Sequence, residues 1–263
     1  TVAPSRLICP GFVDAHVHVE SSLLVPSEFA RVALAHGTIA SVSDPHEIAN
    51  VLGTQGVKFM IASGALTPFY FCWGAPSCVP ATDFETAGGA ISVADLAELL
   101  GMPEVGYLAE MMNYPGVITH NEQVYQKMAV AKLQDKPIDG HAPLLRGQDL
   151  STYIEAGITT DHETISLEEA REKIARGMKI LIREGSAAKN FEALKPLLLE
   201  SPDMCMFCTD DAHPSFLLSG HINRLVRRAC EYGVPLITAL RVAALNPISH
   251  YKLKGGWLRV GDP

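Results

Sequence analysis

The sequence lacks three features that would place it outside the common globular enzymes. No stretch of its 263 residues approaches the ~20 uninterrupted apolar residues of a membrane-spanning helix, and no basic region followed by an apolar run opens the chain. It has no basic excess, because 21 Lys and Arg against 29 Asp and Glu give a formal net charge of -8. It also has no low-complexity tract or internal repeat. We therefore expect a cytoplasmic protein without nucleic-acid or membrane partners.

Cysteine is too sparse and scattered to form a disulfide framework. The six cysteines lie mostly in apolar, strand-like segments, where buried reduced thiols are common. Cys205 and Cys208 form a C-x-x-C pair, but no second pair accompanies them. Residues three apart on a strand also face opposite sides. Core cysteines are therefore favoured over a zinc knot.

Strand and helix patterns are present instead, and they alternate from end to end. Strand patterns cover 7–19, 38–43, 67–73, 105–112, 137–141, 157–162, 179–183 and 204–209, and helix patterns cover 26–36, 93–100, 122–134, 166–176 and 220–232. About eight parallel βα units predict an α/β fold, a (β/α)8 TIM-type barrel, as one domain over 1–263. Ser166 with Glu169 predicts a capping box, and Gly177 the end of that helix. The start at Thr1 and the end at Pro263 are compatible with a piece of a longer chain.

The first predicted strand carries two histidines one residue apart. Side chains alternate along a strand, so His16 and His18 are expected to face the same way, with Asp14 and Glu20 in the same row. Two neutral imidazoles side by side suit zinc, iron or manganese. The alternative is a pair of histidines on a half-buried surface.

Polar residues recur at the ends of the other predicted strands. They are His16 and His18; Asp44, His46 and Glu47; Glu110 and Asn113; His141; Asp161, His162 and Glu163; and Asp210 and Asp211. Barrel active sites lie at the carboxyl ends of the strands. The pattern therefore predicts a metal site at that end of the barrel.

These motifs carry a family resemblance. The blocks are residues 14–22, 43–47, 75–80, 109–113, 140–142, 160–163 and 208–211, in this order. They resemble the amidohydrolase superfamily of metal-dependent hydrolases and, more narrowly, the prokaryotic adenine deaminase family. That family usually adds an accessory β-sandwich and a C-terminal domain, and we expect neither within these 263 residues. Ser215 and Phe216 also stand where the family usually carries acidic residues.

The resemblance implies a binuclear metal centre that deaminates adenine. The reaction is hydrolysis of a C–N bond of a cyclic amidine, giving hypoxanthine and ammonia in purine salvage, by attack of metal-activated hydroxide on C6. His16 and His18 would hold one ion, His141 and His162 the second, with Glu110 as bridge and Asp210 completing the first site. Two divalent ions, Mn²⁺, Fe²⁺ or Zn²⁺, suit such a ligand set.

The same resemblance suggests roles for the remaining polar residues. Asp210 is assigned as general base, and a second carboxyl group is needed to protonate N1 of the ring. Asp44 and Glu163 are the catalytic candidates, with Glu47 a third, and each could instead orient a ligand histidine. Glu163 can serve only if its strand ends before it. The predicted substrate-binding residues are His46, Glu47, Asn113 and Ser186.

Two other interpretations stay open. The chain could be another amidohydrolase, acting on a cyclic amide or a different 6-substituted purine. Cyclic-amide hydrolases often bridge their metals with a carboxylated lysine, where this chain offers Glu110. It could also be an inactive barrel that serves a structural role. The expected partners are a small purine substrate and a second copy of the chain in a homodimer.

Overall fold

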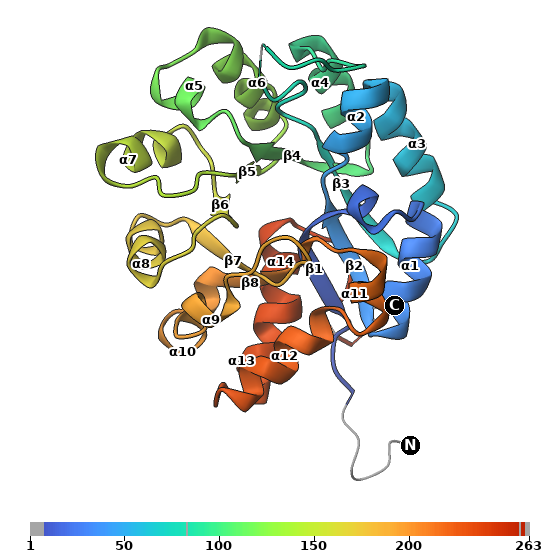
Figure 1. The fold of residues 1–263 in the computed structure, drawn as a ribbon, viewed down its shortest axis with the longest axis vertical. Helices are drawn as coiled ribbons and strands as arrows, with labels where there is room; N and C mark the ends of the chain where they lie inside the picture. Colours follow the sequence, from blue (N-terminus) through green and yellow to red (C-terminus); the bar gives the residue numbers. More distant parts are fainter. Residues whose placement is uncertain (1–7, 83, 258, 261–263) are drawn as a thin grey trace.

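Strands and helices alternate along the chain (Figure 1). The structure is a computed structural model that describes residues 8–82, 84–257 and 259–260. Its strands are β1 Phe12–His18, β2 Thr38–Ser43, β3 Tyr70–Ala75, β4 Val105–Met111, β5 Ile138–Gly140, β6 Thr160–Asp161, β7 Lys179–Arg183, β8 Cys205–Cys208 and β9 Asp210–Asp211. Its α-helices are α1 Pro26–Ala35, α2 His46–Leu52, α3 Thr54–Gly64, α4 Val93–Leu100, α5 Tyr114–Ile118, α6 Glu122–Leu133, α7 Gly147–Glu155, α8 Leu167–Ala175, α9 Phe191–Leu194, α10 Leu197–Glu200, α11 Pro214–Leu218, α12 Ile222–Glu231, α13 Leu236–Leu240 and α14 Asn246–His250. Short turns of other helix types are η1 Val19–Ser22, η2 Pro202–Met204 and η3 Arg241–Leu245.

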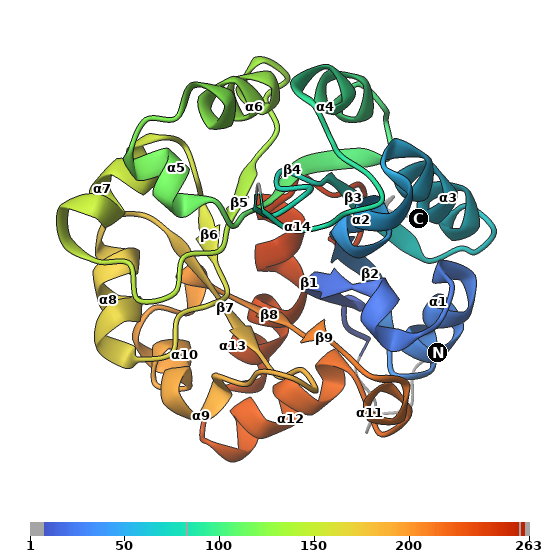
Figure 2. The ribbon, with the colours of Figure 1, turned by 45° about the horizontal axis from the view of Figure 1, so that its top comes forward.

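The strands form a ring surrounded by helices (Figure 2). Hydrogen-bonded neighbours follow the orders β5-β4-β3-β2-β1-β9 and β6-β7-β8. β9 continues β8, and its pairing with β1, with Val17 opposite Asp210, joins the two sheets. On the other side, an isolated parallel bridge between Ile138 and Ile158 joins β5 to the segment before β6. This arrangement is the predicted (β/α)8 barrel, with β8 and β9 together as the eighth strand.

The predicted strand boundaries are correct for β2 and β7 and less accurate elsewhere. The predicted strand 67–73 begins only at Tyr70, because Thr67 Oγ1 accepts the Phe69 amide in a turn. The predicted strands 137–141 and 157–162 are longer than the observed β5 and β6. β1 begins at Phe12, and Leu7 at the start of the prediction lies outside the described residues.

Helix ends follow local hydrogen-bond chemistry. Half of the predicted capping box is present at α8: Ser166 Oγ accepts the Glu169 amide at 3.2 Å, while the Glu169 carboxylate turns inward to Lys173. Gly177 follows α8 with φ +90°, a conformation that ends a helix and favours glycine. Among the described residues, no helix is long and apolar enough to cross a membrane.

The core has an interior part and an outer part. Inside the barrel, Val13 and Ala15 pack with Tyr107, Met206 and Cys208, among others. Outside, apolar helix faces pack against the other sides of the strands. Cys205 belongs to the outer part and Cys208 to the interior, and both are buried free thiols. This confirms the prediction of core cysteines that face opposite sides.

Candidate metal centre

Most of the histidines and acids of the predicted site line one cavity at the carboxyl ends of the strands. Its volume is about 400 Å³. It is lined by His18, His46, Glu47, Glu110, Met112, His141, His162, Glu163, Arg183, Ala188, Asp210 and Asp211. They come from the ends of β1, β2, β4, β5, β6, β7 and β9 and the turns that follow. The predicted location of the site is therefore correct.

An irregularity in β1 decides which side chains reach this cavity. The β1–β2 register shifts between Asp14 and Val17, so Ala15 lies in the barrel interior and the next residue, His16, still faces the site. The prediction that Asp14 shares the row of the histidines is wrong, because Asp14 points the other way and pairs with His221, the residue before α12. Glu20 is not in the row either, since β1 ends at His18. Burial raises the pKa of Glu20 to about 7.

His16, His18 and Asp210 form what we call the first half-site. The Nε2 atoms of the two histidines are 3.2 Å apart. Asp210 Oδ1 lies 3.5 Å from His16 Nε2 and 3.3 Å from His18 Nε2. Asp210 has φ +59°, which turns its carboxylate toward the histidines and is tolerated by Asp better than by most residues. These atoms converge closely enough to bind one ion.

His141 and His162 form the second half-site, and Glu110 lies between the two half-sites. Glu110 Oε1 is 3.3 Å from His18 Nε2. Its other oxygen, Oε2, is 2.6 Å from His141 Nδ1 and 3.1 Å from His162 Nε2. Burial raises the pKa of Glu110, but hydrogen bonds from His141, His162 and His18 outweigh burial and hold it well below its usual range. A carboxylate with one oxygen toward each half-site suits a bridging ligand.

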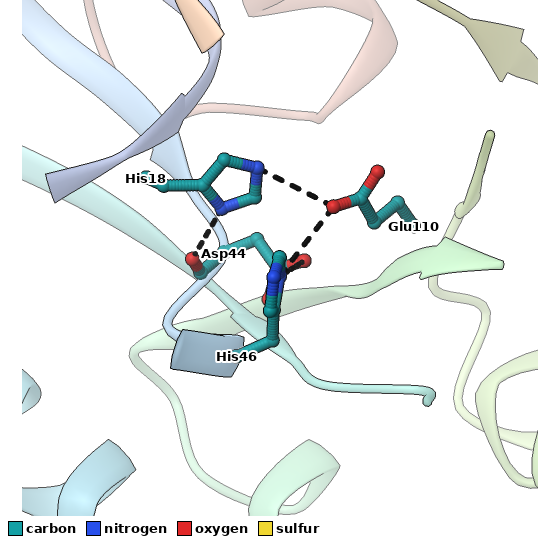
Figure 3. A group of neighbouring side chains, drawn as sticks. All are labelled: His18, Asp44, His46 and Glu110. Carbon is teal, nitrogen blue, oxygen red and sulfur yellow. Dashed lines mark hydrogen bonds and ion pairs between the residues drawn. The ribbon is translucent and has the colours of Figure 1, made fainter. Parts of the chain in front are cut away.

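Asp44 and His46, which follow β2, extend this cluster (Figure 3). The backbone carbonyl of Asp44 lies 3.0 Å from His18 Nδ1. Its carboxylate lies 3.0 Å from His46 Nδ1, which is also 3.4 Å from Glu110 Oε1. Burial lowers the pKa of His46, but the Asp44 carboxylate outweighs it and raises the value to about 9. Asp44 therefore orients His18 through its backbone and His46 through its side chain.

Glu163 faces the cavity because β6 ends at Asp161. Its Oε1 lies 3.6 Å from His162 Nε2 and 3.8 Å from His141 Nδ1. Arg183 donates to both Glu163 oxygens, at 2.6 and 2.9 Å, and also to Asp210 Oδ2. Arg183 is therefore the ion-pair partner of both acids. The sequence allowed a role for Glu163 only if its strand ends before it, and β6 does end at Asp161.

The imidazole of His18 shows that the cluster fits a cation. Its Nδ1 faces a carbonyl oxygen, so Nδ1 carries the proton of the neutral ring. The unshared electron pair of Nε2 then points at carboxylate oxygens of Glu110 and Asp210, both 3.3 Å away. Such an arrangement repels unless a proton or a metal ion lies between these atoms. Accordingly, burial lowers the pKa of His18, but hydrogen bonds with Asp210 and Glu110 outweigh it and raise the value well above 6.5. The donor set therefore fits a divalent metal.

The predicted substrate residues divide between the cavity and its surroundings. His46 and Glu47 line the cavity. Asn113 and Ser186 do not: Asn113 Oδ1 accepts the Gly116 amide at the start of α5, and Ser186 Oγ accepts the His213 amide. Both side chains make capping or loop contacts, and their roles in substrate binding stay predictions. Met112 lines the cavity, whereas its neighbour Met111 is fully buried.

Sequence reasoning missed the buried groups behind the ligands. Lys173 of α8 is fully buried and pairs with Asp161 and Glu169. Tyr153 of α7 is also fully buried, and its hydroxyl accepts the His141 amide at 3.0 Å and donates to the Met111 carbonyl at 2.8 Å. The sequence did contain one sign that Lys173 is buried. It lies next to Ile174 and three residues after Ala170, which places it on the apolar side of the predicted helix 166–176.

Three comparisons place the chain among known proteins. It is 58% identical over 260 residues to an adenine deaminase of Salinibacter ruber, covering 99% of this chain and 48% of the relative. It is 55% identical over 259 residues to an adenine deaminase of Methanosarcina mazei, covering 98% and 47%. The chain thus spans about half the length of the relatives it matches.

The fold is similar to that of a solved N-acetyl-D-glucosamine-6-phosphate deacetylase from Mycobacterium smegmatis. The TM-score is 0.67 at 16% identity, with 100% of this chain and 84% of that chain covered. At this identity the likeness shows the fold alone. The sequence itself matches the family described as "Amidohydrolase family" over residues 7–263. Since that match extends over nearly the whole chain, the chain belongs to the amidohydrolase family.

Proposed function

We propose that this barrel supplies the metal centre and the catalytic carboxylates for hydrolytic deamination of adenine to hypoxanthine and ammonia. The observation that carries the proposal is the meeting of four imidazoles and two carboxylates, from the ends of β1, β4, β5, β6 and β9. The relatives named adenine deaminase, at 55–58% identity over nearly all of this chain, support adenine as the substrate. Glu110 between the half-sites argues against a cyclic-amide hydrolase bridged by a carboxylated lysine.

The proposed cofactor is a pair of divalent ions, Mn²⁺, Fe²⁺ or Zn²⁺. His16, His18 and Asp210 would hold the first ion and His141 with His162 the second, with Glu110 shared. When bound, such ions act as Lewis acids that make water a strong nucleophile at neutral pH. Mixed imidazole and carboxylate donors accept all three metals, so metal identity is left to experiment.

Asp210 is the proposed general base. Its Oδ1 faces His16 and His18, while Arg183 holds its Oδ2. Oδ1 is therefore the oxygen placed to take a proton from the attacking water and to pass it toward the leaving ammonia. Arg183 keeps the carboxylate in this orientation throughout.

Glu163 is the better placed of the two predicted acids for N1 of the ring. Its carboxylate lines the cavity and its side chain is 17% exposed. Asp44 is 1% exposed, does not line the cavity, and holds His46. We therefore infer that Glu163 protonates or hydrogen-bonds N1, with His46 and Glu47 as further substrate contacts. Asp44 is inferred to position His18 and His46.

The test is ammonia release from adenine by the 263-residue chain reconstituted in parallel with Mn²⁺, Fe²⁺ and Zn²⁺, with metal content measured on the same samples. We expect about two metals per chain and turnover of adenine. Bound metal without turnover would contradict adenine as the substrate of this chain and would redirect the search to other 6-substituted purines or cyclic amides. Failure to bind any of the three metals would overturn the proposed centre. The expected homodimer and the cytoplasmic location belong to the same proposal, and sedimentation equilibrium tests the dimer.

A further inference from the structure

A buried ammonium lies directly behind the second half-site. Lys173 of α8 has no exposed surface. Its Nζ donates to the Ala142 carbonyl at 2.8 Å, Asp161 Oδ2 at 3.0 Å, Thr164 Oγ1 at 3.0 Å and Glu169 Oε1 at 2.7 Å. A buried charge costs several kcal/mol unless it is paired and hydrogen-bonded, and here all three N–H groups have acceptors. Such an arrangement holds its partners in fixed positions.

Two of the four partners of Lys173 are chain neighbours of the second half-site ligands. Ala142 follows His141, and Asp161 precedes His162. Asp161 Oδ1 also accepts the Ala142 amide at 2.8 Å. Asp161 accepts the Ala142 amide and Lys173 donates to the Ala142 carbonyl, so together they hold both backbone polar groups of the residue after His141. Asp161 is itself the residue before His162, so this contact links the two ligand segments.

Backbone pairing alone does not fix the distance between these two histidines. β5 has three residues and β6 has two. The two segments share an isolated bridge at Ile138 and Ile158, which lies before both ligands. At the level of His141 and His162, side-chain hydrogen bonds replace the missing strand ladder.

We propose that Lys173 is a positioning residue that sets the spacing of His141 and His162, and thereby selectively sets the affinity of the second half-site for a divalent metal. The inference rests on the proposed function, because it takes the centre to hold two ions. Lys173 does not line the cavity, so it acts on the ligands through its hydrogen-bond partners, of which Ala142 and Asp161 adjoin His141 and His162 in the chain. Loss of Lys173 is expected to weaken metal binding at the second half-site and to leave binding at the first unchanged. General destabilisation of the fold would weaken binding at both.

The experiment is a titration of the metal-free 263-residue chain with Co²⁺, followed by its visible absorption and by equilibrium dialysis. The wild type is expected to bind two equivalents. Lys173→Met is expected to bind the first equivalent with unchanged affinity and the second ~10–100-fold more weakly, the usual loss when a group supporting a ligand is removed. Lys58→Met is the matched control, since Lys58 pairs with Glu98 at the surface of α3 and is expected to leave both equivalents unchanged.

A second pair of variants guards against a Lys173→Met chain that does not fold. Asp161→Asn keeps the Lys173–Glu169 pair but removes the charged acceptor beside His162, so the same selective loss is expected. Glu169→Gln keeps the Lys173–Asp161 link and is expected to retain both equivalents.

Two outcomes would contradict the proposal in different ways. If the wild type binds two Co²⁺ and a folded Lys173→Met or Asp161→Asn chain binds both with wild-type affinity, or loses both equally, the positioning role is wrong and the proposed function stands. If the wild type itself binds fewer than two Co²⁺, the proposed binuclear centre is wrong and the inference fails with it.

Discussion

The two half-sites of the metal centre are held in different ways. β1, which carries His16 and His18, pairs with β2 on one side and β9 on the other, and Val17 lies directly opposite Asp210. The side chains of His16 and His18 are 0% and 5% exposed, whereas that of His141 is 28% exposed. The first half-site is thus positioned by strand register, and the second by buried side chains between short strands. Metal ligands can therefore be positioned either by backbone pairing of strands or by hydrogen bonds from buried side chains.

Each half-site nevertheless has a buried aspartate behind it. Asp161 holds Ala142 and is paired with Lys173 of α8. Behind the first half-site, Asp14 accepts the Thr209 amide at 2.9 Å and its hydroxyl at 2.5 Å, and pairs at 2.9 Å with His221, the residue before α12. Asp14 and Asp161 both belong to barrel strands, whereas their partners lie outside these strands, at the start of α12 and within α8.

The largest expected effect comes from removing a ligand of the first half-site. His16→Ala and Asp210→Asn should each lower adenine turnover by at least ~10³-fold while leaving the fold largely intact, because each removes a metal contact and not a core side chain. Steady-state ammonia release and circular dichroism check this. Asp203→Asn, an exposed change, is the control. Undiminished activity in either ligand variant would overturn the metal assignment.

A smaller but still selective effect is expected at Asp14. Asp14→Asn keeps the volume but leaves the Thr209 hydroxyl and His221 facing an amide group in a buried place. We expect ~10–100-fold weaker metal binding at the first half-site and a loss of about 1–3 kcal/mol in the free energy of unfolding. Co²⁺ titration and urea unfolding measure the two quantities. Weaker binding at the second half-site alone would show that the two supports are not separate.

Tyr153→Phe should have a milder effect, on the second half-site. The change deprives the His141 amide of its acceptor and the Met111 carbonyl of its donor, without removing a charge. The expected destabilisation is about 1–2 kcal/mol, with metal affinity lowered only at the second half-site. Urea unfolding and Co²⁺ titration check it. Tyr125→Phe, which removes a longer hydroxyl bond of 3.3 Å to Val117, is the control and should change neither quantity by as much.

An effect on stability alone, with metal binding unchanged, is expected at the opposite end of the strands. His250 Nε2 is 3.2 Å from Thr159 Oγ1, at the residue before β6. Burial, aided by Lys179, lowers the pKa of His250 to about 3, so the folded chain keeps this ring neutral where the unfolded chain, with the ordinary value of 6.5, binds a proton. The free energy of unfolding contributed by His250 therefore falls as the pH falls below 6.5, by at most ~1.4 kcal/mol per pH unit.

His250→Gln tests this sign. The loss of unfolding free energy between pH 7 and pH 5 should be smaller in the variant than in the wild type, by about 2 kcal/mol at most. Urea unfolding at the two pH values measures it. His120→Asn, at an exposed position, is the control. An unchanged or larger loss in His250→Gln would contradict the prediction.

The sequence predicted the barrel and the end of it that carries the site, because both follow from local patterns. Alternating strand and helix periods indicate βα units, and polar residues at strand ends such as His141 and Asp210 mark one edge. The direction of Asp14 could not be predicted, since the shift in β1 register depends on pairing with β2. The pattern of side-chain periodicity is reliable only while a strand remains regular.

The supporting contacts were also beyond sequence reasoning. Arg183 pairs with Glu163 and Asp210, and Lys173 contacts Ala142, through packing of segments that are distant in the chain. No local propensity encodes these partners. Asn113 and Ser186 stay predictions: their position after a strand suggests substrate contact, and each side-chain oxygen accepts a backbone amide that local patterns did not indicate.

The pairing of β1 with β9 has a consequence for the order in which the protein assembles. Asp14 and Thr209 are 195 positions apart, so the contacts that bring Asp210 to His16 close a loop of most of the chain, whereas neighbouring strands from β1 to β5 pair over short separations. Long loops close late, after local contacts have formed. We therefore expect the first half-site to be completed late in folding, so that tight metal binding would report that the barrel has closed.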